Sequence, residues 1–172
     1  MLANRLLVMS AMMLALIVMA FVSPCAAAVV VGDKAPDFQL GSVDGKTTIK
    51  LSDYTTKPTL LVFWAGWCPH CQQMAGVEQK IFTELGVKGM NVVGVSLDSS
   101  REAADSFVKS RSLTFPNAYG GSREGRETAE KYGIRGIPTF FVIDKDGIVK
   151  ATYSGEVREE TIRQEFAKLG VI

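Results

Sequence analysis

The chain has 172 residues, of which 47% are hydrophobic and 22% are charged. This length and composition suit a single globular domain with enough apolar material for a core. Arg5 is the one charged residue before position 29, so 18 of the 19 basic residues balance the 18 acidic residues in the rest of the chain. No basic tract stands out, which excludes nucleic acid as an expected partner.

The N-terminal residues have the pattern of an export signal. After Arg5 comes an uncharged, almost wholly apolar stretch over residues 6–22, and small residues follow it. The pattern predicts a secretory signal peptide over residues 1–28. Two alternatives stay open: an uncleaved membrane anchor, since the stretch is close to the lower limit of about 17 residues for a span, and lipid attachment at Cys25. We expect residues 29–172 to work in the periplasm or elsewhere outside the cytoplasm, either free or anchored in the cytoplasmic membrane.

The first elements predicted after residue 28 are strands. The turn residues 43–46 predict a hairpin, with a strand near residues 47–51. The uninterrupted apolar run over residues 59–65 is typical of a strand that is covered on both faces. A helical pattern follows and extends to about Leu85, where Gly86 is expected to end it.

The second half alternates between strand and helix patterns. Ser99 and Glu102 form a capping-box signature at the start of one helix. The expected strands cover residues 91–97, 139–143 and 148–153, and the expected helices cover residues 99–110, 127–132 and 157–169. This alternation, closed by a hairpin and a helix, predicts an α/β layer structure with a mixed sheet.

Cys68 and Cys71 form a C-x-x-C pair where an apolar strand passes into a helix. A helix start offers unpaired N–H groups and the positive end of the dipole, which stabilise a thiolate, and the thiolate is the nucleophile in disulfide exchange. Pro69 suits the first turn because no donor is needed there. We therefore expect Cys68 to be an exposed attacking nucleophile and Cys71, on the same helix face, to be the resolving partner.

His70 is the only histidine of the chain. If protonated, its charge stabilises the Cys68 thiolate and shifts the pair toward the oxidising end; the alternative is a solvated side chain with little effect. A zinc site needs four ligands, and haem attachment needs a histidine in place of Gln72, so neither fits. No metal and no cofactor are expected besides the redox-active disulfide of Cys68 and Cys71.

The segment from Trp64 to Cys71, together with residues 136–139, resembles the thioredoxin superfamily. The opening at residues 31–38 and an insertion over about residues 97–125 are similar to the TlpA/ResA branch of exported, often membrane-tethered thioredoxins. The resemblance implies a thioredoxin-like three-layer fold over residues 29–172, with a central mixed sheet flanked by helices.

The same resemblance implies a substrate-binding surface beside the cysteines. It implies that the Ile137–Pro138 peptide bond is cis, that Pro138 faces the cysteines, and that the backbone of Ile137 pairs with a substrate peptide. Trp67, directly before the first cysteine, is the third expected substrate contact.

The chain departs from its relatives at two positions that often carry a buried carboxylate. Val62 stands where thioredoxin has an aspartate, and Met74 stands where haem-maturation members often have a glutamate. The absence of both carboxylates removes the proton acceptor that relatives offer to the second cysteine, here Cys71, which argues against a reductive role in cytochrome c maturation. The dipeptide Pro69–His70 is instead the one found in the DsbA oxidants, which favours disulfide formation.

The resemblance leaves the direction of electron flow open. In either direction the expected partners are cysteine-containing exported proteins and a membrane redox partner, with membrane contact only through an uncleaved N-terminus. Two other functions stay open as alternatives. A copper chaperone would use both cysteines but lacks a distant histidine. A peroxiredoxin-like peroxidase would have a threonine three residues before the attacking cysteine, where this chain has Ala65.

Overall fold

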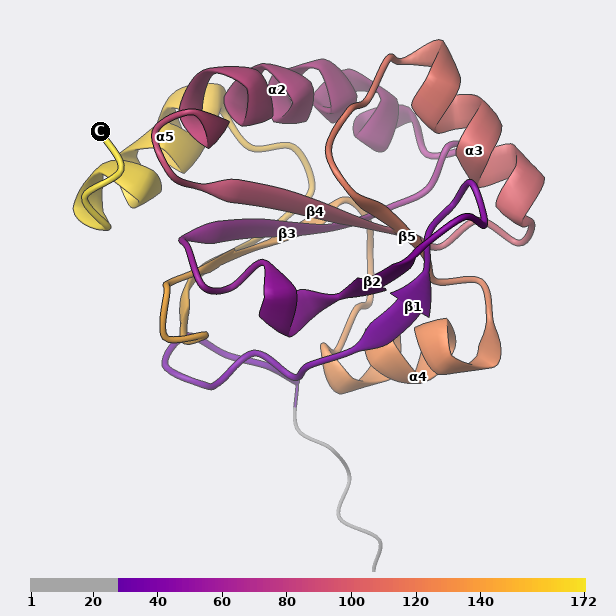
Figure 1. Ribbon diagram of the computed structural model, residues 1–172, viewed down its shortest axis with the longest axis horizontal. Helices are drawn as coiled ribbons and strands as arrows, with labels where there is room; N and C mark the ends of the chain where they lie inside the picture. Colours follow the sequence, from indigo (N-terminus) through magenta and orange to yellow (C-terminus); the bar gives the residue numbers. More distant parts are fainter. Residues whose placement is uncertain (1–27) are drawn as a thin grey trace, which may run out of the picture.

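A computed structural model describes residues 28–172 (Figure 1). The main sheet has five strands in the order β5-β4-β3-β6-β7, and β1 and β2 form a separate antiparallel pair. The strands are β1 (Gln39–Gly41), β2 (Thr48–Lys50), β3 (Thr59–Trp64), β4 (Asn91–Ser96), β5 (Asn117–Tyr119), β6 (Thr139–Ile143) and β7 (Val149–Ser154). The helices are α2 (Pro69–Gly86), α3 (Arg101–Ser110), α4 (Arg123–Lys131), α5 (Glu159–Lys168) and the 3-10 helix η1 (Leu51–Asp53).

The predicted signal peptide or membrane anchor at residues 1–28 lies outside the described residues, apart from its last position. The same holds for the alternative of lipid attachment at Cys25. Within the described range, none of the helices has the length and apolarity that crossing a membrane requires.

Strand β3 lies at the centre of the sheet, and both of its faces are buried. Leu60, Val62 and Trp64 belong to the core on one side, whereas Leu61 and Phe63 belong to the core on the other. Because successive side chains of a strand point to opposite faces, a strand covered on both faces needs an uninterrupted apolar run. β3 pairs parallel with β4 and antiparallel with β6, so the prediction of a mixed sheet is confirmed.

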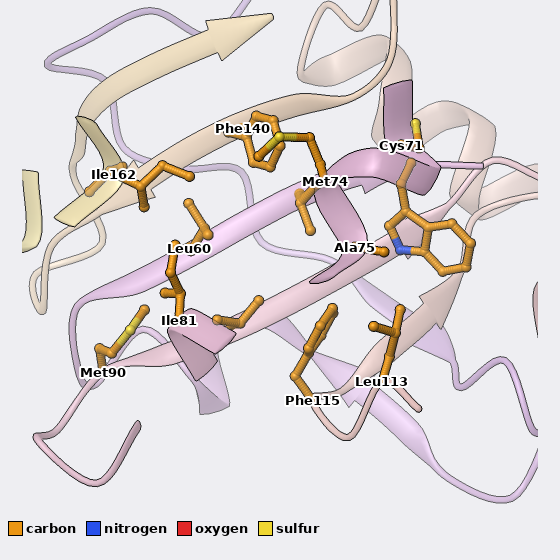
Figure 2. Close-up of a cluster of buried hydrophobic side chains, with 14 of the residues drawn as sticks. Leu60, Cys71, Met74, Ala75, Ile81, Met90, Leu113, Phe115, Phe140 and Ile162 are labelled. Carbon is orange, nitrogen blue, oxygen red and sulfur yellow. The ribbon is translucent and has the colours of Figure 1, made fainter. Parts of the chain in front are cut away.

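Helices α2, α3 and α5 cover one face of the sheet, and α4 and the β1–β2 pair cover the other (Figure 1). Figure 2 shows the first of these layers, where Met74 and Ile81 of α2 share an apolar cluster with Leu60 and Phe140 of the sheet. The predicted three-layer α/β arrangement is confirmed, and it places the start of α2 at the carboxyl end of β3.

Two helix starts differ from the prediction. Helix α3 is capped by Ser100, whose Oγ accepts a hydrogen bond from the backbone N–H of Ala103 at 3.1 Å, so the cap predicted at Ser99 is wrong by one residue. Helix α4 begins before the predicted residue 127 because Ser122 caps it by accepting a backbone N–H of the first turn. Two adjacent serines, Ser99 and Ser100, precede α3, and local sequence does not tell which of them caps.

Strand β5 was not predicted from the sequence. It has only three residues, and its first residue, Asn117, is polar and buried. Asn117 Oδ1 accepts a hydrogen bond from Trp64 Nε1 at 3.0 Å, and its Nδ2 donates to the carbonyl oxygen of Phe115 at 2.8 Å. Asn117 therefore lies in the core as the partner of a tryptophan that is distant in sequence.

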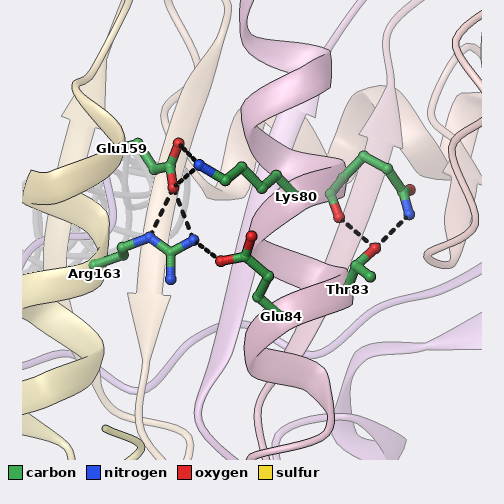
Figure 3. A network of polar contacts seen from close by, with 6 residues as sticks. Lys80, Thr83, Glu84, Glu159 and Arg163 are labelled. Atoms are coloured by element: carbon green, nitrogen blue, oxygen red, sulfur yellow. Dashed lines mark hydrogen bonds and ion pairs between the residues drawn. The ribbon is translucent and has the colours of Figure 1, made fainter.

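Charged side chains connect α5 to α2 (Figure 3). Glu159 Oε1 lies 3.0 Å from Lys80 Nζ and 2.7 Å from Arg163 Nη2, and Arg163 Nη2 also lies 2.5 Å from Glu84 Oε2. Exposed ion pairs contribute little one at a time, but these four groups share partners in a network. The network holds α5 alongside the helix that carries the cysteine motif.

Candidate active site

Cys68 is the residue that caps the start of α2. Its backbone is extended, at φ −82° and ψ 117°, and Pro69 is the first helical residue. The carbonyl oxygen of Cys68 accepts the N–H of Gln72 at 3.0 Å, and its Sγ accepts the N–H of Cys71 at 3.4 Å. The N–H of Cys71 belongs to the first turn and has no carbonyl partner inside the helix, so the sulfur takes the place that a serine or aspartate oxygen has in an ordinary cap.

The expectation that Cys68 is exposed is wrong, since only 4% of its surface is accessible. The thiol donates a hydrogen bond to the carbonyl oxygen of Ile137 at 3.4 Å. The Ile137–Pro138 peptide bond is cis, as the resemblance implied. The backbone at Ile137, just before β6, thus packs against the sulfur of Cys68, although the two residues are distant in sequence.

A buried carboxylate fixes the turn that leads into the motif. Asp98, which follows β4, accepts the backbone N–H of Gly66 with both oxygens, at 3.1 and 3.0 Å, and the hydroxyl of Ser96 at 2.7 Å. Gln72 Nε2 in turn donates to the carbonyl oxygen of Gly66 at 2.8 Å. Hydrogen bonds thus join the residue that follows β4 to the turn that follows β3, and this turn holds Cys68 in place.

Replacing Asp98 with alanine is expected to lower the free energy of unfolding by about 3 kcal/mol, because it leaves the N–H of Gly66 and the hydroxyl of Ser96 without their acceptor. Urea unfolding measures this loss. Asp53→Ala, at an exposed position, is the matched control and should change stability by no more than about 0.5 kcal/mol. Equal losses in the two variants would show that Asp98 does not hold the turn.

Cys71 is buried behind Cys68, with 2% of its surface accessible. Burial raises the pKa of the Cys71 thiol well above its usual range, and the neighbouring Cys68 side chain raises it further. Both cysteines are free thiols in the structure. Cys71 is therefore protonated at neutral pH and must lose its proton before it can attack a disulfide.

The other residues predicted for the site surround the pair. Trp67 is 66% exposed and stands beside Cys68 as an accessible aromatic surface. His70 is also exposed, and its Nδ1 lies 2.5 Å from Oε1 of Glu156, on the segment between β7 and α5. A carboxylate beside the imidazole opposes the field of a protonated His70. The predicted redox tuning by Pro69 and His70 stays a prediction.

The described residues add no third ligand to the cysteines. Between residues 28 and 172, no group of three or more His, Cys, Asp or Glu side chains gathers in a way that could hold a metal ion. The copper-chaperone alternative would need His70 as a ligand, and His70 is paired with Glu156 instead.

Sequence reasoning missed a buried carboxyl group on α2. Glu78 is 2% exposed and belongs to the buried stripe of the helix: Cys71, Met74, Ala75, Glu78, Ile81 and Leu85. The i, i+3, i+4 spacing of this stripe was the available signal. The sequence analysis considered only the family positions at Val62 and Met74, and it did not consider Glu78.

Comparisons with known proteins agree with this geometry. Residues 31–152 match the family model of the AhpC/TSA family. The thiol-disulfide oxidoreductase ResA of Bacillus thuringiensis subsp. konkukian is 32% identical over 139 residues, which cover 81% of this chain and 78% of that protein. A crystal structure of a thiol:disulfide interchange protein DsbE from Chlorobium tepidum has a TM-score of 0.75 and 33% identity, covering 83% of this chain and 99% of the other.

A more distant structure supports the fold alone. The thioredoxin domain of a thiol-disulfide oxidoreductase from Bacteroides vulgatus is 21% identical, with a TM-score of 0.73 over 82% of this chain and 98% of the other. The predictions of a thioredoxin-like fold and of disulfide exchange are thus confirmed. The chain belongs to the AhpC/TSA family and is a thiol-disulfide oxidoreductase similar to ResA.

Proposed function

We propose that this oxidoreductase exchanges disulfides with cysteine-containing exported proteins outside the cytoplasm, and that Cys68 attacks and Cys71 resolves. The observation that carries the assignment of roles is the helix start, where the sulfur of Cys68 accepts an N–H of the first turn while Cys71 lies buried behind it. The signal-like pattern of residues 1–28 supports the periplasmic location, with the protein either free or anchored in the cytoplasmic membrane.

The exchange proceeds in two steps. The Cys68 thiolate attacks one sulfur of a substrate disulfide, forms a mixed disulfide and releases the other sulfur as a thiolate. Cys71 then loses its proton and attacks Sγ of Cys68, which releases the second substrate thiolate. The substrate gains two electrons, and Cys68 and Cys71 lose them as their disulfide forms. The reverse sequence oxidises a substrate dithiol.

The surface around Cys68 suits a peptide substrate. Trp67 offers an exposed aromatic ring, and aromatic rings bury a large area at low entropic cost. We assign substrate contact to Trp67 and to the backbone at Ile137 and Pro138, next to the attacking sulfur. The direction of electron flow is set by the redox partner, a membrane electron donor for reduction or a reoxidising protein for disulfide formation.

A trap in the native host tests this function. Cys71→Ala keeps the attacking thiol and removes the resolving one, so mixed disulfides with Cys68 should accumulate. Mass spectrometry of the captured proteins identifies the substrates: apocytochromes would assign the reductive role, and a broad set of secreted cysteine proteins would assign disulfide formation. The double variant Cys68→Ala/Cys71→Ala is the control. An empty trap would contradict the proposed function.

A further inference from the structure

His70 and Glu156 form a polar pair beside the cysteine motif. Nδ1 of His70 lies 2.5 Å from Oε1 of Glu156, although the two residues are 86 positions apart in the chain. Within residues 28–172, no lysine or arginine side chain lies within ion-pair distance of Glu156. The basic partner of this carboxylate is therefore the imidazole that stands two residues after Cys68.

The position of Glu156 depends on the segment that packs against the sulfur of Cys68. Directly after β7, Gly155 turns the chain with a φ of 81°, a conformation that favours glycine. The backbone N–H of Gly155 donates to the carbonyl oxygen of Pro138 at 2.8 Å. The preceding carbonyl, that of Ile137, accepts the thiol of Cys68 at 3.4 Å. Two neighbouring carbonyl groups therefore contact the attacking sulfur and the turn that carries Glu156.

The sulfur of Cys68 has other partners than this imidazole. Its hydrogen bonds within the described residues are those with the carbonyl oxygen of Ile137 and the N–H of Cys71. An imidazolium beside a thiolate would stabilise it, and with it the reduced state, because the disulfide carries no charge. Nδ1 of His70 is instead paired with a carboxylate, and such a pair adds no net positive charge near the sulfur.

We propose that Glu156 is a positioning residue that keeps the imidazole of His70 from stabilising the Cys68 thiolate. The disulfide of the cysteine pair is then less oxidising than the Pro69–His70 dipeptide alone would make it. This inference rests on the proposed function, because it concerns the redox equilibrium of the same two cysteines. The dipeptide favours disulfide formation, and a carboxylate from a segment distant in sequence offsets that preference.

Equilibration with glutathione measures this effect. The dithiol of Cys68 and Cys71 reacts with oxidised glutathione to give the protein disulfide and two molecules of reduced glutathione, so the protein loses two electrons and two protons and glutathione gains them. Acid quenching, alkylation and mass spectrometry give the oxidised fraction of the protein. In Glu156→Ala the equilibrium constant for oxidation of the protein at pH 7 should fall about threefold, the size that an exposed ion pair supports. This change corresponds to a reduction potential about 14 mV higher.

Two comparisons show whether Glu156 acts through His70. Glu84→Ala removes an exposed, paired carboxylate near the other end of α2 and should leave the equilibrium constant unchanged. In the His70→Gln background, Glu156→Ala should change the constant by less than about 1.3-fold, because the imidazole that the carboxylate holds is absent. The side chains of His70 and Glu156 are 63% and 45% exposed, so all these variants should fold.

An equal change in the wild-type and His70→Gln backgrounds would mean that the carboxylate acts on the sulfur directly, and this result would overturn the proposal. An unchanged or increased equilibrium constant in Glu156→Ala would also overturn it. A wild-type protein that forms no disulfide with oxidised glutathione would contradict the proposed function instead.

Discussion

Replacing Cys68 with serine is expected to reduce disulfide exchange at least about 1,000-fold, because a hydroxyl is not ionised near neutral pH and cannot replace the thiolate that forms the mixed disulfide. The N-cap position tolerates serine, which is a preferred residue there. The fold should therefore survive the change, so a loss of activity would result from the missing thiolate and not from unfolding. Reduction of insulin disulfides with dithiothreitol as the electron source measures the effect.

A matched change at the second cysteine separates the two roles. Cys71→Ser should still attack an aromatic disulfide once, and so release one equivalent of coloured thiolate where the wild type releases two. Cys68→Ser should release none at a comparable rate, since Cys71 is buried and its pKa is raised. If Cys68→Ser retained exchange and Cys71→Ser lost the first step, the assignment of nucleophile and resolving residue would be reversed.

Much of the scaffold could be predicted because its signals are local. The apolar run that forms β3 must be buried on both faces, and this places it at the centre of a sheet. The helix that follows is identified by Pro69 and by the spacing of its apolar residues. The C-x-x-C motif can be placed at this junction without long-range information, so the prediction that Cys68 and Cys71 lie where β3 leads into α2 is confirmed.

The features that sequence reasoning missed depend on contacts between distant segments. The resemblance implied that Ile137 lies beside the cysteines, but not that Ile137, 69 residues away, leaves Cys68 buried, and nothing indicated that Glu156 reaches His70 from 86 residues away. No periodicity encodes either contact. The burial of Glu78 is different, because its place in the apolar stripe of α2 was visible, but a single glutamate in a helix is ordinarily solvated. Only the packed structure shows that Glu78 is buried and not solvated.

Glu78 is also expected to make the protein less stable as the pH rises. Its pKa is about 8 in the folded protein and 4.5 in the unfolded chain, so the folded state binds more protons between these values. A group whose folded pKa is raised contributes stability below the unfolded pKa, and that contribution is lost as the pH rises through the folded pKa. Between pH 5 and pH 8 the linkage relation gives a loss of roughly 3 to 4 kcal/mol.

Urea unfolding of the wild type and of Glu78→Gln at several pH values isolates this effect, since the amide does not titrate and all other groups are common to both proteins. The free energies of unfolding of the two proteins should diverge in favour of the variant by roughly 3 to 4 kcal/mol from pH 5 to pH 8. The carboxyl groups with a lowered pKa, such as Asp44 and Glu159, lose their contributions on the acid side of this window.

Glu84→Gln, with an exposed and paired carboxylate, should follow the wild type across the same window. A constant difference between Glu78→Gln and the wild type would mean that water reaches the Glu78 carboxylate in the folded protein and holds its pKa near the ordinary value. A growing difference would mean that the wild type gives up stability at neutral pH because it keeps an ionisable group inside its core.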